Sequence, residues 1–171
     1  MLVICKKLHQ IRFGQLMAVY EEGNRENGQD HYPNLSPGEQ MLRAEQDFYQ
    51  YLKDDFYLAA EAVYYLWQIN NRYVSALRME VYRDGLLLEA LETLLDQRGK
   101  GYASSLVCAV QQLPELDGRK IYSHVGKKNE ASLKAHQKCG FEIISDRAVY
   151  IDGSVNDRCY TLCYLCKKAG A

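Results

Sequence analysis

The sequence predicts an α/β (α+β) fold with a mixed central sheet, in the order β-α-α-β-β-β-α-β-α-β-β. Three observations support this prediction. Short apolar segments between turn residues indicate strands, apolar residues at i, i+3, i+4 and i+7 indicate helices, and both kinds of segment alternate along the chain. The length of 171 residues suits one domain, so residues 1–171 are expected to form a single domain.

The first third of the chain is expected to hold one strand and two helices. Residues 1–8 are predicted as a strand and residues 11–21 as a helix. The polar stretch 22–35 has the composition of a loop and is long for a structural connection. Two interpretations of it stay open, a lid over a substrate and a disordered surface loop. The sequence SPGE at residues 36–39 forms a capping box with proline at the first helical position, which begins a helix through Leu52.

The remaining elements follow from turn residues and apolar periodicity. An antiparallel meander is predicted first, with a hairpin turn at Asn70-Asn71 and a second turn at Arg83-Asp84-Gly85. Its strands are residues 62–69, 73–81 and 86–95. A helix, a strand, a second helix and two final strands are then expected at residues 103–113, 120–125, 129–140, 141–151 and 158–166, the last two joined by a turn at 152–157.

The loop that joins the strand 86–95 to the helix 103–113 is predicted to bind an anion. Two glycines let the backbone adopt conformations that are closed to other residues, and the first turn of the helix offers unpaired N–H groups and the positive end of its dipole. These features suit a phosphate or pyrophosphate. The segment lacks the Gly-x-x-x-x-Gly-Lys-Ser/Thr of a P-loop, and Ser104 stands where the dinucleotide fingerprint needs its third glycine.

This loop resembles the acetyl-CoA loop of the GNAT acetyltransferases, whose pattern is Arg/Gln-x-x-Gly-x-Gly/Ala. In this sequence the pattern reads Arg98-x-x-Gly101-x-Ala103. The gap to the next motif holds one helix and one strand, as the family requires.

A second segment, residues 129–141, resembles the GNAT pattern Asn-x-x-Ala/Ser-x-x-x-Tyr-x-Lys-x-Gly-Phe. Its matching residues are Asn129, Ser132, Lys138, Gly140 and Phe141. Two motifs in the right order and spacing make the resemblance specific. It covers residues 60 to 166 clearly and the first sixty residues in outline.

The resemblance implies an enzyme that transfers an acetyl group from acetyl-CoA to an amine by direct attack. It also implies that a bulge splays the strand before the loop, so that main-chain groups at Leu91 and Thr93 bind the pantetheine and the thioester carbonyl. The residues that it places on the cofactor are Leu91, Thr93, Arg98, Gly99, Lys100, Gly101, Tyr102, Ala103, Asn129 and Ser132.

A base must take a proton from the amine, because a primary amine with a pKa of about 10.4 is protonated at neutral pH. The candidates are Glu89 and Glu92, on the strand that leads into the loop, and His124. On a regular strand the two glutamates point to opposite faces, which a bulge would change. Glu89 is favoured, and outward salt bridges are the alternative for both glutamates.

A proton donor for the leaving thiolate is the point at which the sequence departs from the family. Relatives usually carry tyrosine at the position of His136. A neutral imidazole can still donate one N–H, so His136 is a candidate general acid, and an inert substitution is the alternative. Tyr102 and Tyr122 are the other candidates for this role.

Two functions therefore stay open. The first is an N-acetyltransferase, acting on a small-molecule amine more readily than on a peptide amine. The second is a GNAT-like module that binds acyl-CoA as a sensor or partner without efficient catalysis. Aminoglycosides, polyamines, amino acids and protein N-termini all remain candidates for the acceptor.

Charge and hydropathy exclude other classes of function. The chain has 21 basic and 22 acidic residues, a net charge of −1, which argues against nucleic-acid binding through bulk charge. Apolar runs are too short to span a bilayer, and residues 1–7 lack the order of a signal peptide. We therefore expect a cytoplasmic protein without nucleic-acid or membrane partners.

The six cysteines are expected to be buried thiols in a reducing compartment rather than metal ligands. Cys159 and Cys163 would point to one face of a strand and Cys166 to the other, so three thiolates cannot converge on one ion. No metal site is predicted. The same C-terminal strands are rich in tyrosine and cysteine, and two interpretations stay open for them, a homodimer surface and ordinary core packing.

Overall fold

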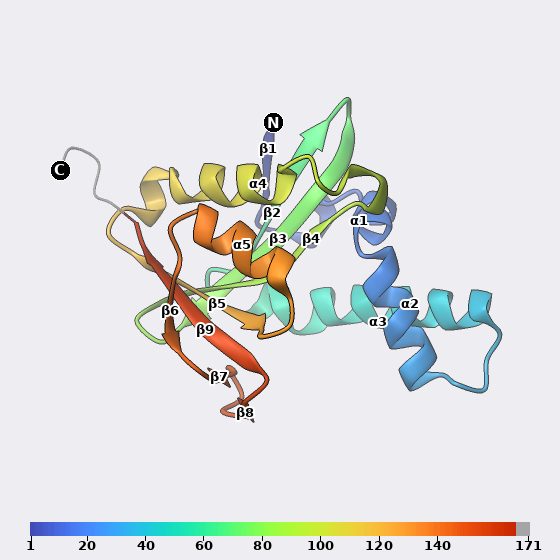
Figure 1. Cartoon of the computed structure of the whole chain (residues 1–171). Helices are drawn as coiled ribbons and strands as arrows, with labels where there is room; N and C mark the ends of the chain where they lie inside the picture. Colours follow the sequence, from blue (N-terminus) through green and yellow to red (C-terminus); the bar gives the residue numbers. More distant parts are fainter. Residues whose placement is uncertain (167–171) are drawn as a thin grey trace.

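A seven-stranded sheet forms the centre of the protein (Figure 1). The computed structural model describes residues 1–166. The sheet has the order β1-β2-β3-β4-β5-β9-β6, and a separate two-stranded ladder joins β7 to β8. Among the described pairings only β4–β5 is parallel, as a crossover through a helix requires. The strands are β1 (Leu2–Cys5), β2 (Val63–Ile69), β3 (Arg72–Tyr82), β4 (Gly85–Thr93), β5 (Lys120–Gly126), β6 (Glu142–Ser145), β7 (Ala148–Val149), β8 (Val155–Asn156) and β9 (Cys159–Leu165).

Helices cover both faces of the sheet. Helices α4 (Tyr102–Gln111) and α5 (Glu130–Lys138) pack on one face, and α1 (Phe13–Val19), α2 (Glu21–His31) and α3 (Pro37–Asp54) lie on the other (Figure 1). Short 3-10 helices occur at Leu8–Gln10, Phe56–Leu58, Leu95–Gln97 and Pro114–Leu116. No helix among residues 1–166 is long and apolar enough to cross a membrane.

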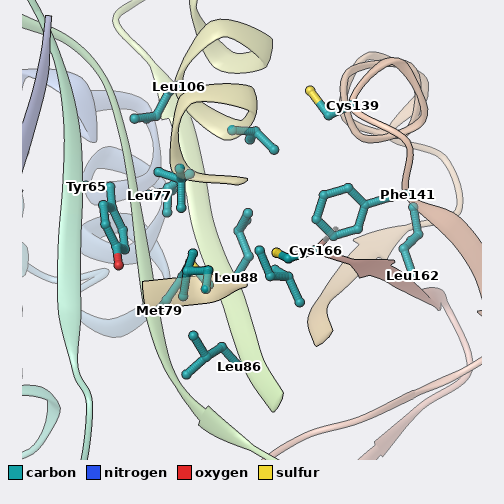
Figure 2. Packing of buried hydrophobic residues seen from close by; sticks show 14 of the residues in the cluster. Tyr65, Leu77, Met79, Leu86, Leu88, Leu106, Cys139, Phe141, Leu162 and Cys166 are labelled. Carbon is teal, nitrogen blue, oxygen red and sulfur yellow. The ribbon is translucent and has the colours of Figure 1, made fainter. Parts of the chain in front are cut away.

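Each helical layer has its own apolar core. On the α4 face, Leu106 of α4 points toward the sheet residues Leu77 and Leu88, and Phe141 closes the layer beside Leu162 (Figure 2). On the opposite face the core is built from residues of α1, α3 and the first strands. Alternate residues of one strand belong to different cores, which is the pattern of a sheet buried on both faces.

Most of the predicted elements are confirmed with shifts of a few residues, but the stretch 22–35 is wrong as a loop. Residues Glu21–His31 form helix α2. Gly28, which suggested a loop, lies against helix α3, where an added Cβ would come within 2.7 Å of the carbonyl oxygen of Gln40. Glycine here allows two helices to approach closely, so it is a packing residue rather than a helix breaker.

The C-terminal strands also differ from the expected pattern. The strand expected at residues 141–151 is divided into β6 and β7, and the turn expected at 152–157 contains β8. The cysteines are not uniformly buried, because Cys108 is exposed and both Cys159 and Cys163 are partly exposed. Cys166 packs in the core on the α4 face.

A bulge in β4 separates the half of the strand that pairs regularly from the half that forms the site. Glu89 pairs with Arg78 and Glu92 pairs with Ala76, so two residues of β4 stand opposite the single residue between Ala76 and Arg78. Ala90 in the bulge has φ of 50°, a left-handed conformation. The hydroxyl of Tyr20 donates to the carbonyl oxygen of Ala90 at 2.7 Å and thereby holds the bulge in place.

Candidate active site

A large cavity lies between the loop after β4 and helix α5. Its volume is about 720 Å³. The walls come from the end of β4, the loop and first turn of α4, and one side of α5. Of the residues that the resemblance places on the cofactor, all line this cavity except Lys100, whose Nζ instead contacts Oε1 of Gln97 at 2.9 Å.

The loop presents backbone N–H groups to this cavity. Gly99 and Gly101 have φ of +77° and +79°, and Gly101 caps helix α4. No hydrogen bond within the described chain uses the N–H groups of residues 99–104, and the first that does is Ser105, bonded to the carbonyl of Gly101 at 2.9 Å. Several free donors at a helix N-terminus form an anion-binding site.

Cationic side chains surround the same cavity. Arg98 lines it from the loop, and Lys134 and Lys138 line it from α5. The Arg98 guanidinium is 2.7 Å from Glu22 and 3.4 Å from Glu92, and its Nε donates to the carbonyl of Thr93 at 3.2 Å. These contacts hold the Arg98 side chain at the edge of the cavity. The cavity thus combines free N–H donors with positive charge, which suits a polyanion.

Asn129 positions the other wall of the cavity. Its side-chain oxygen accepts a hydrogen bond from the N–H of Ser132 at 3.0 Å, the N-cap contact that its place in the sequence predicts. The capped helix runs alongside the cavity, so that Ala131 and Ala135 face it together with Lys134 and Lys138. Two small residues on this face leave room for a ligand.

A second, smaller cavity opens through the sheet where β4 and β5 separate. The two strands pair as far as Leu88 and Ser123. Beyond that point lies a cavity of about 180 Å³. Leu91, Asn129 and Ser132 line both cavities, so the two adjoin each other. A ligand in the large cavity can therefore reach the gap in the sheet.

Both candidate carboxylates lie on the side of the sheet that α1, α2 and α3 cover. The bulge adds one residue between them, so the exception expected for a bulged strand applies and the two side chains share a face. Glu89 lines the gap and contacts Arg78 at 3.3 Å, with 25% of its side chain exposed. Glu92 lines the large cavity and contacts Arg98. Burial raises the pKa of Glu92, and Arg98 opposes this rise.

His136 lies in the gap with both ring nitrogens engaged. Its Nδ1 is 2.8 Å from the carbonyl oxygen of Ser132, which can only accept, so Nδ1 carries the proton. Its Nε2 is 2.9 Å from the hydroxyl of Ser123, which then donates to it. The side chain is buried, with 1% exposed, and burial lowers its pKa. At neutral pH it is therefore an uncharged hydrogen-bond acceptor for Ser123.

Tyr102 and Tyr122, the other candidate proton donors for the leaving thiolate, lie in different parts of the structure. Tyr102 lines the large cavity at the start of α4. Tyr122 lies on the opposite face of the sheet, where its hydroxyl donates to Asp84 at 2.5 Å and its ring packs against Tyr82. The structure therefore places Tyr122 outside both cavities.

Sequence reasoning missed several residues of the site. Lys134 stands four residues before Lys138, so both lie on one helix face, and this spacing is a signal that could have identified the first. Ser123 has no signal of its own, because only the sheet register brings it to His136. Among residues 1–166 no group of three or more His, Cys, Asp and Glu side chains could hold a metal ion.

Comparison with known proteins agrees with this geometry. The sequence profile described as the acetyltransferase (GNAT) family matches residues 28–141. A search of curated protein sequences gives no match.

Solved structures share the fold at low sequence identity. The ribosomal-protein-S18-alanine N-acetyltransferase from Escherichia coli has 15% identity and a TM-score of 0.60, over 99% of this chain and 97% of that one. The PaiA N-acetyltransferase from Thermoplasma acidophilum, in complex with coenzyme A, has 11% identity and a TM-score of 0.62, over 96% and 99%. A spermidine N-acetyltransferase chimera from Vibrio cholerae and hSSAT has 16% identity and a TM-score of 0.57, over 96% of this chain and 95% of that one.

The profile match covers more than half of the chain, and every residue that lines the cavity at the glycine loop, except Glu22, lies within the matched range. The chain belongs to the acetyltransferase (GNAT) family and is an acetyl-CoA-dependent N-acetyltransferase.

Proposed function

We propose that this enzyme acetylates a small-molecule amine by direct attack of the amine on acetyl-CoA. One observation carries the proposal: the cavity with free N–H donors at residues 99–104 adjoins the gap between β4 and β5. The anionic part of the donor then lies at the loop while its thioester reaches the gap, where an acceptor can approach from the other face of the sheet.

The residues of the loop and of α5 hold the donor in this proposal. The N–H groups of residues 99–104 bind the pyrophosphate, and Arg98, Lys134 and Lys138 supply positive charge around it. Main-chain groups at Leu91 and Thr93 bind the pantetheine and the thioester carbonyl. A donor to that carbonyl stabilises the developing oxyanion, an effect of about 3 kcal/mol on the barrier.

Helix α2 and Tyr20 cover the C-terminal end of β4, and this supports a small acceptor. Glu22 of α2 contacts Arg98 of the loop at 2.7 Å, and Tyr20 contacts the carbonyl of Ala90. Helix α2 thereby closes over the end of the strand along which an extended peptide would lie. The 180 Å³ gap has room for an acetyl group and an amine.

His136 acts on the leaving thiolate through Ser123 in this proposal. Both nitrogens of the ring are engaged, so the ring has no N–H that faces the gap. The Ser123 hydroxyl lines the gap and is the group that can turn toward the sulfur. His136 is therefore proposed as the residue that orients Ser123.

Glu89 and Glu92 remain candidates for the general base. Each is ion-paired with an arginine and must leave that pair before it can take a proton. This observation also favours a second candidate function, an acyl-CoA-binding module with little catalysis.

Acetyl-CoA turnover, followed as release of free thiol, tests the proposal. The acceptors would be a polyamine, an arylalkylamine, an aminoglycoside, an amino acid and a peptide with a free N-terminus. Turnover that needs a small amine and is lost in Gly101→Asp supports the proposal. Transfer to the peptide alone would refute the small acceptor, and tight binding without transfer to any amine would favour the sensor.

A further inference from the structure

We propose that His124 of β5 is the catalytic base that removes the N–H proton of the acceptor amine as the new C–N bond forms. This inference rests on the proposed acetyl transfer and assigns its base to a residue other than the two glutamates. His124 lines the gap between β4 and β5 together with Glu89 and Ala90. It therefore stands where the acceptor would meet the thioester.

Hydrogen bonds fix which ring nitrogen of His124 carries the proton. The hydroxyl of Thr161 donates its single proton to the carbonyl oxygen of Arg147 at 2.7 Å. The same hydroxyl oxygen is 3.2 Å from Nδ1 of His124, so it must accept from Nδ1–H. In the neutral ring Nε2 is then left with a free lone pair.

The Nε2 atom is buried and has no hydrogen-bond partner in the described chain. A buried polar atom without a partner is unfavourable, so such an atom calls for an explanation. The rings of Tyr82 and Tyr150 pack edge-on against His124, with centroids 5.5 and 5.3 Å away. These contacts hold the plane of the imidazole.

Each of the two glutamates must break an ion pair before it can act as the base. Glu89 contacts Arg78 and Glu92 contacts Arg98, and both nitrogens of His136 are engaged. Among the candidates in the described chain, His124 is therefore the one with a ring nitrogen that has no hydrogen-bond partner to lose. Glu89 lies near enough to stabilise the imidazolium that would form.

The acetyl-transfer step is balanced in protons. The ammonium form of the acceptor first loses one proton to solvent, and the neutral amine attacks the thioester carbonyl. Bonding to carbon makes the nitrogen strongly acidic, so a base of moderate strength suffices, and His124 Nε2 takes this second proton. The C–S bond breaks and the thiolate takes a proton from solvent. The imidazolium returns its proton to solvent, so that the net products are amide, coenzyme A and one released proton.

Several charged and titratable groups set the pH range of this step. Burial lowers the pKa of His124, and Arg83 adds to this, whereas Glu89 and the carbonyl of Val149 oppose it. Tyr82 and Tyr150 also face the ring. The kcat/KM for the amine should therefore fall on the acid side, below pH 6.5, as Nε2 becomes protonated.

The activity test compares His124→Gln with His9→Gln, an exposed histidine outside both cavities. For the best amine of the panel, kcat/KM should fall at least 100-fold in His124→Gln, since general bases contribute about 10²–10⁴. The fall of kcat/KM at acid pH should disappear in His124→Gln, while its Kd for acetyl-CoA stays within twofold of the wild type. In His9→Gln, both kcat/KM and Kd should stay within twofold of the wild type. Full activity in a folded His124→Gln would overturn the assignment and leave the acetyltransferase proposal intact.

A second measurement decides the inference without turnover. Long-range nitrogen–proton NMR spectra of the ligand-free protein should show His124 with a protonated Nδ1 and a bare Nε2 at neutral pH. Thr161→Val, which removes the acceptor of Nδ1–H, should mix the two tautomers. If the wild-type ring instead carries its proton on Nε2, His124 cannot be the base, even if no amine of the panel is acetylated.

Discussion

Alanine at Gly101 should weaken acetyl-CoA binding much more than it weakens the fold, and Gly153 offers a matched control. Both glycines have a left-handed backbone, with φ of +79° and +83°, and an added Cβ would meet nothing within 4 Å at either site. The two substitutions therefore carry the same backbone strain, about 1–2 kcal/mol. They differ in position, because Gly101 lines the large cavity and Gly153 lies in the β7–β8 turn.

The strain is present in both the free and the bound protein, so it cancels in the binding free energy. What remains for Gly101→Ala is the methyl group itself, which takes up space beside the free N–H donors. We expect Kd for acetyl-CoA to rise at least tenfold, about 1.4 kcal/mol, with Gly153→Ala within twofold of the wild type. Both variants should lose a similar few degrees in Tm, at about 2–4 °C per kcal/mol for a chain of this length.

Isothermal titration calorimetry and thermal unfolding of the three proteins check this prediction. Equal Kd values for Gly101→Ala and the wild type would refute the role of the loop as a close-contact anion site. Equal weakening by Gly153→Ala would show that the loss comes from general loosening of the fold.

Three further predictions follow from buried and cationic groups. Ser123→Ala leaves His136 Nε2 without its partner and should cost about 1–3 kcal/mol of stability in urea unfolding. Burial lowers the pKa of both His124 and His136 from 6.5. The unfolded chain therefore binds more protons below pH 6.5. Stability should fall there by up to about 1.4 kcal/mol per pH unit for the buried His136 and by less for the partly exposed His124, as measured by urea unfolding across pH. An unchanged midpoint down to pH 5 would contradict this. Lys138→Glu should weaken acetyl-CoA binding about fivefold at low salt and less at high salt, whereas Lys53→Glu on α3 should not.

The sequence predicts the cofactor side of this site well, because that side depends on local backbone conformation. Glycine at residues 99 and 101, followed by a periodic apolar helix, specifies a turn and a helix N-terminus wherever the segment lies in the fold. Asn129 likewise caps its own helix. Most elements of the sheet are predicted for the same reason, since alternation and turn residues are local signals.

Helix α2 shows where local signals fail. Its glycines and asparagines are typical of a loop, but Asn24 is buried and Gly28 allows close packing on α3. Tertiary contacts outweigh the weak helix propensity of these residues. The helix in turn supplies Glu22, which holds Arg98 of the cofactor loop 76 residues away.

The catalytic side of the site is set by register and by a bulge, and neither is a local property of sequence. One extra residue at Ala90 turns Glu89 and Glu92 to the same face, and each of them meets an arginine there. The pairing of β5 with β9 brings Thr161 opposite His124 and so decides the tautomer of the ring. The sequence favours a carboxylate of β4 as the base because it does not show that Glu89 and Glu92 are paired with Arg78 and Arg98. With both glutamates paired, the nitrogen without a hydrogen-bond partner is Nε2 of His124 on the neighbouring strand β5.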